Sequence, residues 1–287
     1  LTTFFYHINA AWYALLTNNV SRAAGHLETI SATTESMGAP YYRTLWHIGT
    51  AQTEFLLGHT QNADTHIRTA HRLSLAMKSQ VMEWYTLLID AWILLQEGKQ
   101  TKGLLSLHRS LSLGRRHGYL HLEFYQPAVM RFLCVKALDE GIEPDYVKGL
   151  ISKLGLTPPQ PPECAVAACC LEEWPYPLKI YTLGRFEIVK DGEPLQFSGK
   201  EQKKPLELLK ALIGFGGRDI SAEQLIDALW PDADGDQAQK TFETTLSRLR
   251  RLVGDDTCIT CRSRRLSLNP LYCWVDSLAL SHLLGMN

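Results

Sequence analysis

A recurrence of about 40 residues in the first half of the chain constrains the fold more than any other feature. Three sets of residues superpose under this shift: Ala11, Ala51 and Ala91; Leu15, Phe55 and Leu95; and Leu27, Ile67 and Leu107. Small residues at fixed places in a first helix let neighbouring helices approach closely, and large ones in a second helix fill the remaining space. No helix pair of this kind buries its apolar face alone, so the pairs stack. The first half is predicted to be an all-α helical-repeat solenoid.

Helix ends recur with the same spacing. Asn18, Gly58 and Gly98 fall together as residues that tolerate a left-handed cap. The second helix of each pair is expected to end at Gly38 and Gly118, with Lys78 at the middle position. A fourth, degenerate pair is expected from Leu122 to Leu154, with breaks near Gly141 and Pro144. The architecture resembles the tetratricopeptide-type repeats of large bacterial regulators, in which the array binds an effector, a partner protein or another subunit.

The aromatic and histidine side chains of this half are expected to pack the fold and not to form a catalytic or metal site. Its many aromatic residues are interpreted as packing between repeats, with a ligand- or peptide-binding concave surface as the alternative. Its histidines show no HExxH pattern, and His66 and His71 are five positions apart, the wrong separation for one helical face. No metal and no cofactor is expected from them.

The sequence changes in texture after about residue 157. Prolines at 158, 159, 161 and 162 favour an extended spacer, and Pro175 and Pro177 close it. We therefore expect a helical-repeat domain over 1–157, a proline-rich linker over 158–177 and a second domain over 178–287. The formal net charge is −1, so any basic surface must be local. The seven cysteines do not suit a small secreted disulfide framework, which favours reduced thiols in the cytoplasm.

Targeting features are missing from the printed sequence. We see no secretion signal and no apolar run near the ~20 residues that cross a membrane. The chain begins at Leu1, and we expect it to be a segment of a longer protein.

The second half reads as a small sheet, three helices and a hairpin. Two alternating runs flank the turn at Asp191-Gly192, which predicts an antiparallel sheet. A helix is expected from about Lys203 to the Gly214–Gly217 region, and Ser221 is expected to cap a second helix that stops at Pro231. Short strands are then expected around a basic tip.

The third helix is expected from Gln237 to Val253. At about 100° per residue, one face is apolar and the opposite face is basic and rich in hydroxyls. The members of the basic face are Lys240, Thr244, Ser247, Arg248 and Arg251, with Arg250 at its edge. Such a face suits a major groove, where Arg and Lys read guanine. An ordinary solvated helix is the alternative.

The order sheet, three helices and hairpin is the winged-helix arrangement of the helix-turn-helix class. The segments LGRFEIVKDGEPL, KKPLELLKALI, LWPDADGDQAQKTFETTLSRLRRLVG and RRLSLNPLYCWVD resemble the OmpR-type DNA-binding domain, most closely in the form found in AfsR/SARP-type transcriptional activators. The family usually places this domain first, whereas here a helical array precedes it. The expected fold is thus an all-α repeat solenoid followed by an α+β winged-helix domain.

The resemblance implies a role for each candidate residue. Arg248 and Thr244 would approach base edges, while Lys240, Arg250 and Arg251 would hold phosphates or flank the groove, with Ser247 on the same face. Arg262, Arg264 and Arg265 would meet the minor groove or the backbone from the wing, where the Gly-Tyr of many OmpR-type wings is replaced by SRRLSLNP. Trp230 would lie near a phosphate, with a core position as the alternative.

The sequence therefore predicts a bacterial DNA-binding transcriptional regulator that transduces a signal. The expected partners are double-stranded DNA, RNA polymerase, an effector or protein on the repeat domain, and further copies of the chain on DNA, because one domain alone should bind weakly. Activation and repression both stay open, with activation favoured by the resemblance. The alternative is a protein–protein interaction scaffold that uses both parts. An enzyme is not expected, because no GxxxxGK[ST], GxSxG or metal motif occurs.

Overall fold

The computed structural model describes residues 2–36, 39–121, 123–159, 172–197, 202–233, 235–254 and 257–284. The chain divides into two compact units, Leu1–Pro159 and Gln160–Asn287. Most described residues are helical, and the strands among them belong to the second unit. Most of the expected linker, residues 160–171, lies outside the described residues.

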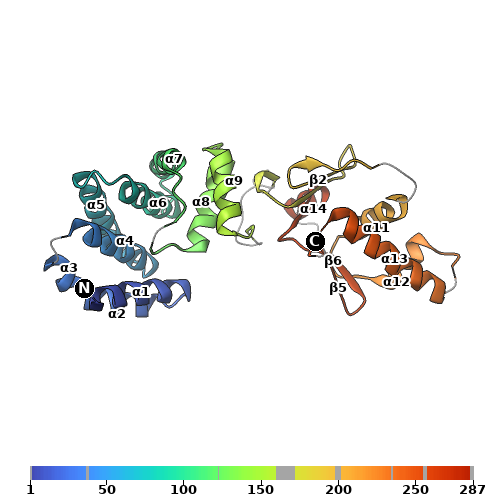
Figure 1. The fold of residues 1–287 in the computed structure, drawn as a ribbon, viewed down its shortest axis with the longest axis horizontal. Coiled ribbons are helices and arrows are strands. Elements are labelled where there is room, and N and C mark those ends of the chain that lie inside the picture. The colour runs from blue at the N-terminus through green and yellow to red at the C-terminus, as the bar shows by residue number, and fades with distance from the viewer. Residues whose placement is uncertain are drawn as a thin grey trace. The chain divides into compact units, whose positions relative to one another are not determined.

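The first unit is built from helices that pair with their neighbours along the chain, as Figure 1 shows. The pairs are α1 with α2, α4 with α5, α6 with α7, and α8 with α9. The helices are α1 Thr2–Leu16, α2 Val20–Thr29, α3 Ser31–Ser36, α4 Pro40–Leu56, α5 Thr60–Ala76, α6 Gln80–Gln96, α7 Gln100–His117, α8 Pro127–Asp139 and α9 Pro144–Leu154.

The 40-residue recurrence is confirmed in the geometry. Ala11, Ala51 and Ala91 each have an exposed fraction of 0%. The backbone turns left-handed at every predicted first-helix stop, with φ of 56° at Asn18, 85° at Gly58 and 77° at Gly98. The same hydrogen bond closes each turn, from the backbone N–H of residue 19 to the carbonyl of residue 14, from 59 to 54 and from 99 to 94. Each first helix therefore ends in the same turn, 40 residues after the last one.

The second-helix stops follow the same rule with one exception in residue type. Gly118 ends α7 with φ of 70°, and Lys78 takes a left-handed φ of 54° at the middle position, where glycine is not present. Gly38 lies outside the described residues. The fourth pair begins at Pro127 and not at Leu122, because the described residues between α7 and α8 are not helical. Its expected break is present, since Gly141 has φ of 65° and Pro144 opens α9.

The second unit combines two small sheets with helices. Its elements are β1 Leu178–Tyr181, β2 Glu187–Lys190, β3 Glu193–Pro194, α11 Lys203–Gly214, β4 Ile220–Ser221, α12 Ala222–Leu229, α13 Gly235–Val253, β5 Ile259–Arg262, β6 Arg265–Leu268, β7 Cys273–Val275 and α14 Asp276–Leu283. One sheet has the order β3-β2-β1-β7, and the other has the order β4-β6-β5. The pairing of β1 with β7 is parallel, so the first strand of the unit lies beside its last strand.

Three helices surround the core of this unit. Leu208 and Leu212 of α11, Leu225 of α12, and Phe242 and Leu249 of α13 are buried together. The helix ends follow local chemistry. The hydroxyl of Ser221 accepts a hydrogen bond from the backbone N–H of Gln224 at 3.1 Å, which caps α12, and the helix ends before Pro231. No helix in the described parts of either unit is long and apolar enough to span a bilayer.

Candidate nucleic-acid interface

The helix α13 is amphipathic, and its apolar side fixes its orientation on the core. Ala238, Phe242, Leu246, Leu249 and Val253 are all buried, with exposed fractions of 7% or less. These positions recur every three or four residues, so the opposite side must face solvent. Thr245 is also buried, where its hydroxyl donates to the carbonyl of Thr241 at 2.7 Å.

Five of the six predicted residues of this helix lie on the exposed side: Lys240, Thr244, Ser247, Arg248 and Arg251. Among the described residues, none of the three cationic side chains of this set has a hydrogen-bond or ion-pair partner. The hydroxyl of Thr244 donates to the carbonyl of Lys240 at 2.9 Å. Its oxygen and its methyl group therefore stay available to a ligand, but its proton does not.

Arg250, the sixth residue, takes a different position. Its side chain is half-buried, and its Nε and Nη2 both donate to the carbonyl oxygen of Ile259, at 3.2 Å and 3.0 Å. Ile259 begins β5, so this pair of hydrogen bonds joins the third helix to the hairpin that follows it. The expected phosphate contact is not what the geometry favours, because the guanidinium is engaged within the protein.

The tip of the β5–β6 hairpin is a two-residue turn between Arg262 and Arg265, which pair across the strands. Ser263 and Arg264 have φ of 48° and 59°. Positive φ at both central positions is typical of a type I′ turn, in which glycine or asparagine is usual. A serine and an arginine in these positions make the turn less favourable, and contacts outside the turn must compensate.

The three arginines of the hairpin differ in what they contact. Arg264 donates to Gln239 Oε1 at 2.6 Å and lies 3.8 Å from a carboxylate oxygen of Glu223, so it ties the tip to α13 and α12. Arg265 pairs with Asp219 at 2.8 Å and also donates to its carbonyl oxygen. Arg262 is exposed and has no partner among the described residues. Only Arg262 is therefore fully available at the tip.

Trp230 follows the last residue of α12 and is half-buried against the core. The ammonium nitrogen of Lys204 lies 5.8 Å from the centroid of its ring. Trp230 therefore lies partly in the core, the alternative position given above, and part of its side chain stays exposed.

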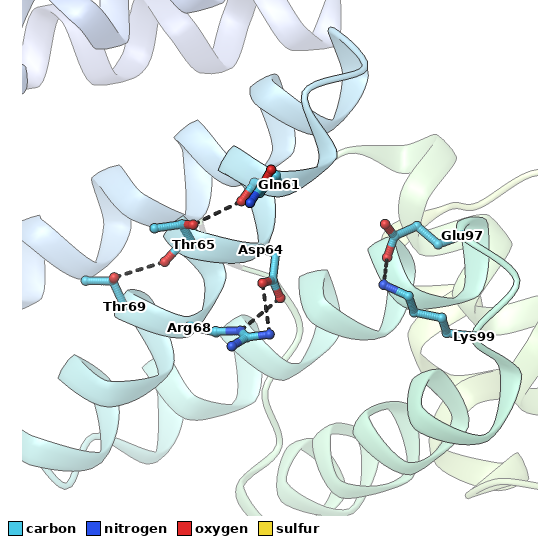
Figure 2. A network of polar contacts seen from close by, with 7 residues as sticks. All are labelled: Gln61, Asp64, Thr65, Arg68, Thr69, Glu97 and Lys99. Atoms are coloured by element: carbon cyan, nitrogen blue, oxygen red, sulfur yellow. Dashed lines mark hydrogen bonds and ion pairs between the residues drawn. The ribbon is translucent and has the colours of Figure 1, made fainter.

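The α13 cations differ from two cations of the first unit whose charges are paired. Figure 2 shows Arg68 of α5 directed at Asp64, at 3.0 Å, and Lys99 directed at Glu97, at 2.8 Å. Those charges neutralise each other locally, as on most solvated helices. The basic surface of α13 and the hairpin, formed by Lys240, Arg248, Arg251 and Arg262, has no such acids in contact with it among the described residues, and it would therefore attract anions.

Some features of the site were not predicted. Asp219 and Gln239 position the hairpin arginines, and only their proximity in the fold reveals it. The strand β4, which pairs with β6, was also missed because it has two residues.

A histidine pattern in the first unit was missed as well. His7 Nδ1 lies 3.0 Å from His26 Nδ1, and His47 Nδ1 lies 2.9 Å from His66 Nδ1. The two pairs are related by the same 40-residue shift as the repeat, which the sequence could have shown.

The CxxC motif at Cys258 and Cys261 does not form a paired site. Cys258 is buried and Cys261 is exposed, as expected for positions three apart in an extended chain. The described residues contain no cluster of three or more metal-ligating side chains. Cys164, Cys169 and Cys170 lie outside the described residues.

Comparison with known proteins finds a relative for part of the chain. The regulatory protein AfsR of Streptomyces griseus is 41% identical over 69 residues, which are 24% of this chain and 7% of that protein. The match thus covers a small share of a much longer relative. No family model matches the chain, and no solved structure matches it.

Proposed function

We propose that the chain is a DNA-binding transcriptional regulator of the AfsR/SARP type. In this proposal, residues 178–287 form an OmpR-type winged-helix domain, and residues 1–157 form a tetratricopeptide-like array that receives a ligand or protein signal. The observation that carries the proposal is the set of α13 cations, Lys240, Arg248 and Arg251, whose side chains lack partners among the described residues, beside a hairpin tied to the same helix. The similarity to the regulatory protein AfsR supports the same class.

The basic surface suggests how DNA would be held. A major groove about 12 Å wide admits an α-helix. Arg248 would donate to a guanine edge, and Thr244 would offer its oxygen or its methyl group to a neighbouring base. Lys240 and Arg251 would pair with phosphates on either side, and Ser247 would lie between them. Arg262 would reach the backbone from the hairpin.

The remaining predicted residues would act indirectly. Arg250 and Arg264 would hold the hairpin in place against α13 and α12, Arg265 would hold it against Asp219 before β4, and Trp230 would support the same surface. Four available cations give weak binding for one domain, so useful affinity would need two or more copies on repeated half-sites. The regulator would act in the bacterial cytoplasm and would recruit RNA polymerase as an activator.

The test is site selection from random duplex DNA, followed by footprinting with the full chain. We expect Arg248→Ala to lower affinity for the selected site by about tenfold, as for the loss of one base contact worth about 1–3 kcal/mol. The matched control is Arg68→Ala, which removes an exposed charge already paired with Asp64 and should leave binding unchanged. No selected sequence, or equal affinity in the Arg248 variant, would count against DNA binding by this surface. Capture of a protein that duplex DNA does not compete away would favour a scaffold instead.

A further inference from the structure

Glu243 is an exposed acid at the border of the basic surface of α13. It follows Lys240 by three positions and precedes Ser247 by four, so it neighbours both residues on the surface of the helix. Glu243 has no part in the DNA contacts proposed above, and a carboxylate placed against phosphates would be repelled by them. Its surroundings decide whether it is an ordinary surface charge or a part of the site.

The contact that Glu243 makes is with an amide and not with a cation. Although Lys240 is one turn away, no ion pair joins the Glu243 carboxylate to a cation among the described residues. Instead, Gln239 Nε2 donates a hydrogen bond to Glu243 Oε1 at 2.8 Å. Asp64 of α5 differs in this respect, because its carboxylate pairs with Arg68 at 3.0 Å. The Glu243 carboxylate is thus oriented by a neutral group and not by the charges of the basic surface.

The same amide connects Glu243 to the tip of the β5–β6 hairpin. Gln239 Oε1 accepts a hydrogen bond from Arg264 Nη2 at 2.6 Å, while Gln239 Nε2 donates to Glu243. A guanidinium only donates and a carboxylate only accepts, so these two hydrogen bonds fix which way the amide points. Both ends of the Gln239 side chain are engaged, and the hairpin in this way holds the Glu243 carboxylate in one orientation. A side chain whose geometry is fixed by such hydrogen bonds is suited to discriminate between ligands.

The second carboxylate oxygen, Glu243 Oε2, has no hydrogen-bond partner in the described part of the chain. On the major-groove edge of DNA, the hydrogen-bond donors are the amino groups of cytosine and adenine, whereas guanine and thymine present acceptors there. Adenine also presents the acceptor N7 beside its amino group, and this acceptor repels a carboxylate. Cytosine is therefore the base that an oriented carboxylate at this position accepts best.

We infer that Glu243 determines sequence specificity by accepting a hydrogen bond from the N4 amino group of a cytosine in the major groove. Gln239 and Arg264 are positioning residues for this contact, because they orient the carboxylate. The charge of Glu243 lowers affinity for DNA of any sequence, and the hydrogen bond to cytosine restores that affinity at the correct site. The inference rests on the proposed DNA binding and names one base of the sequence that is bound.

The experiment selects binding sites from random duplex DNA with the full chain, in parallel for the unaltered protein and for Glu243→Ala. The unaltered protein should select a cytosine at a position where Glu243→Ala accepts any base. On duplexes that differ only at that base pair, exchange of the cytosine should weaken binding of the unaltered protein by about tenfold and that of Glu243→Ala by less than about twofold. In Glu243→Gln the preference should move to adenine, because a glutamine amide pairs with N6 and N7 of adenine.

The matched control is Glu193→Ala in β3, which removes an exposed acid of the same charge from another part of the second unit and should keep the preference for cytosine. Selection of the same cytosine by Glu243→Ala would overturn the inference and leave the proposed DNA binding intact. An equal rise in affinity for every sequence in Glu243→Ala would do the same, because it would identify Glu243 as an ordinary surface charge. If neither protein selects a sequence, the proposed DNA binding itself fails, and the inference fails with it.

Discussion

Arg250 links α13 to the hairpin, whereas Arg248 faces solvent. Replacing Arg250 should therefore lower stability, and replacing Arg248 should weaken DNA binding. Arg250 donates twice to the carbonyl of Ile259, at 3.2 Å and 3.0 Å, and is half-buried. Hydrogen bonds from a charged donor contribute about 1.5–3 kcal/mol, and partial exposure reduces this. We expect Arg250→Ala to lower the free energy of unfolding of the second unit by about 1–2 kcal/mol. At roughly 4 °C per kcal/mol for a domain of this size, Tm should fall by about 4–8 °C.

Arg248→Ala should show the converse. Arg248 is exposed and has no partner among the described residues, so its removal should leave Tm within about 1 °C and weaken binding to duplex DNA. Differential scanning calorimetry measures Tm and fluorescence anisotropy measures DNA affinity on the same samples. Arg250→Lys can keep one of the two hydrogen bonds, so its Tm should lie between those of the unaltered chain and Arg250→Ala. An unchanged Tm in Arg250→Ala, or a large loss of stability in Arg248→Ala, would refute this division of roles.

Three further predictions concern stability. Ser221→Ala removes the cap of α12 and should cost about 1 kcal/mol in urea unfolding, whereas Ser247→Ala on the exposed side of α13 should cost almost nothing. Burial alone would raise the pKa of Asp276, but hydrogen bonds from Thr182 and its neighbours outweigh burial, so the net pKa is lowered. The second unit should therefore lose stability as the pH falls below about 4, and Asp276→Asn should reduce this dependence on pH. The pKa of His47 is lowered from 6.5 to about 4, first by burial and then by the nearby His66, Arg43 and Arg72. Because the unfolded chain binds this proton more readily, the first unit should lose stability as the pH falls from 6.5 to about 4. A His47→Gln variant whose stability depends on pH to the same extent would contradict this.

The repeat in the first unit was accessible from the sequence because it rests on backbone geometry and side-chain size. Buried alanines and left-handed helix ends recur at fixed spacing, and both follow from local rules. The left-handed conformation of Lys78 shows that the fold keeps the turn even where the residue does not favour it. The position of Phe124, which is buried between α7 and α8 in the sequence, could not be predicted, because its ring packs where Gly49 of α4 has no side chain, and Gly49 lies far away in the sequence.

For the basic surface, amphipathic spacing predicted which side of α13 is exposed. It did not predict that Arg250, at the edge of that side, would turn back to Ile259. Nor did it separate Arg262 from Arg264 and Arg265, since a count of charges does not reveal which of them meet Asp219, Glu223 or Gln239. Contacts between distant segments decide whether a charge is available, and periodicity carries no information about them.

The salt dependence of binding to duplex DNA tests the central claim most directly. Three cations without partners among the described residues, Lys240, Arg251 and Arg262, would each displace a counterion from one phosphate, while Arg248 would contact a base. The slope of log Kd against log salt should then be about 2.7 per chain, at about 0.9 for each contact, and should fall by about 0.9 in Arg251→Ala but not in Arg250→Ala. Binding that does not respond to salt, or an equal loss of slope in both variants, would contradict the account.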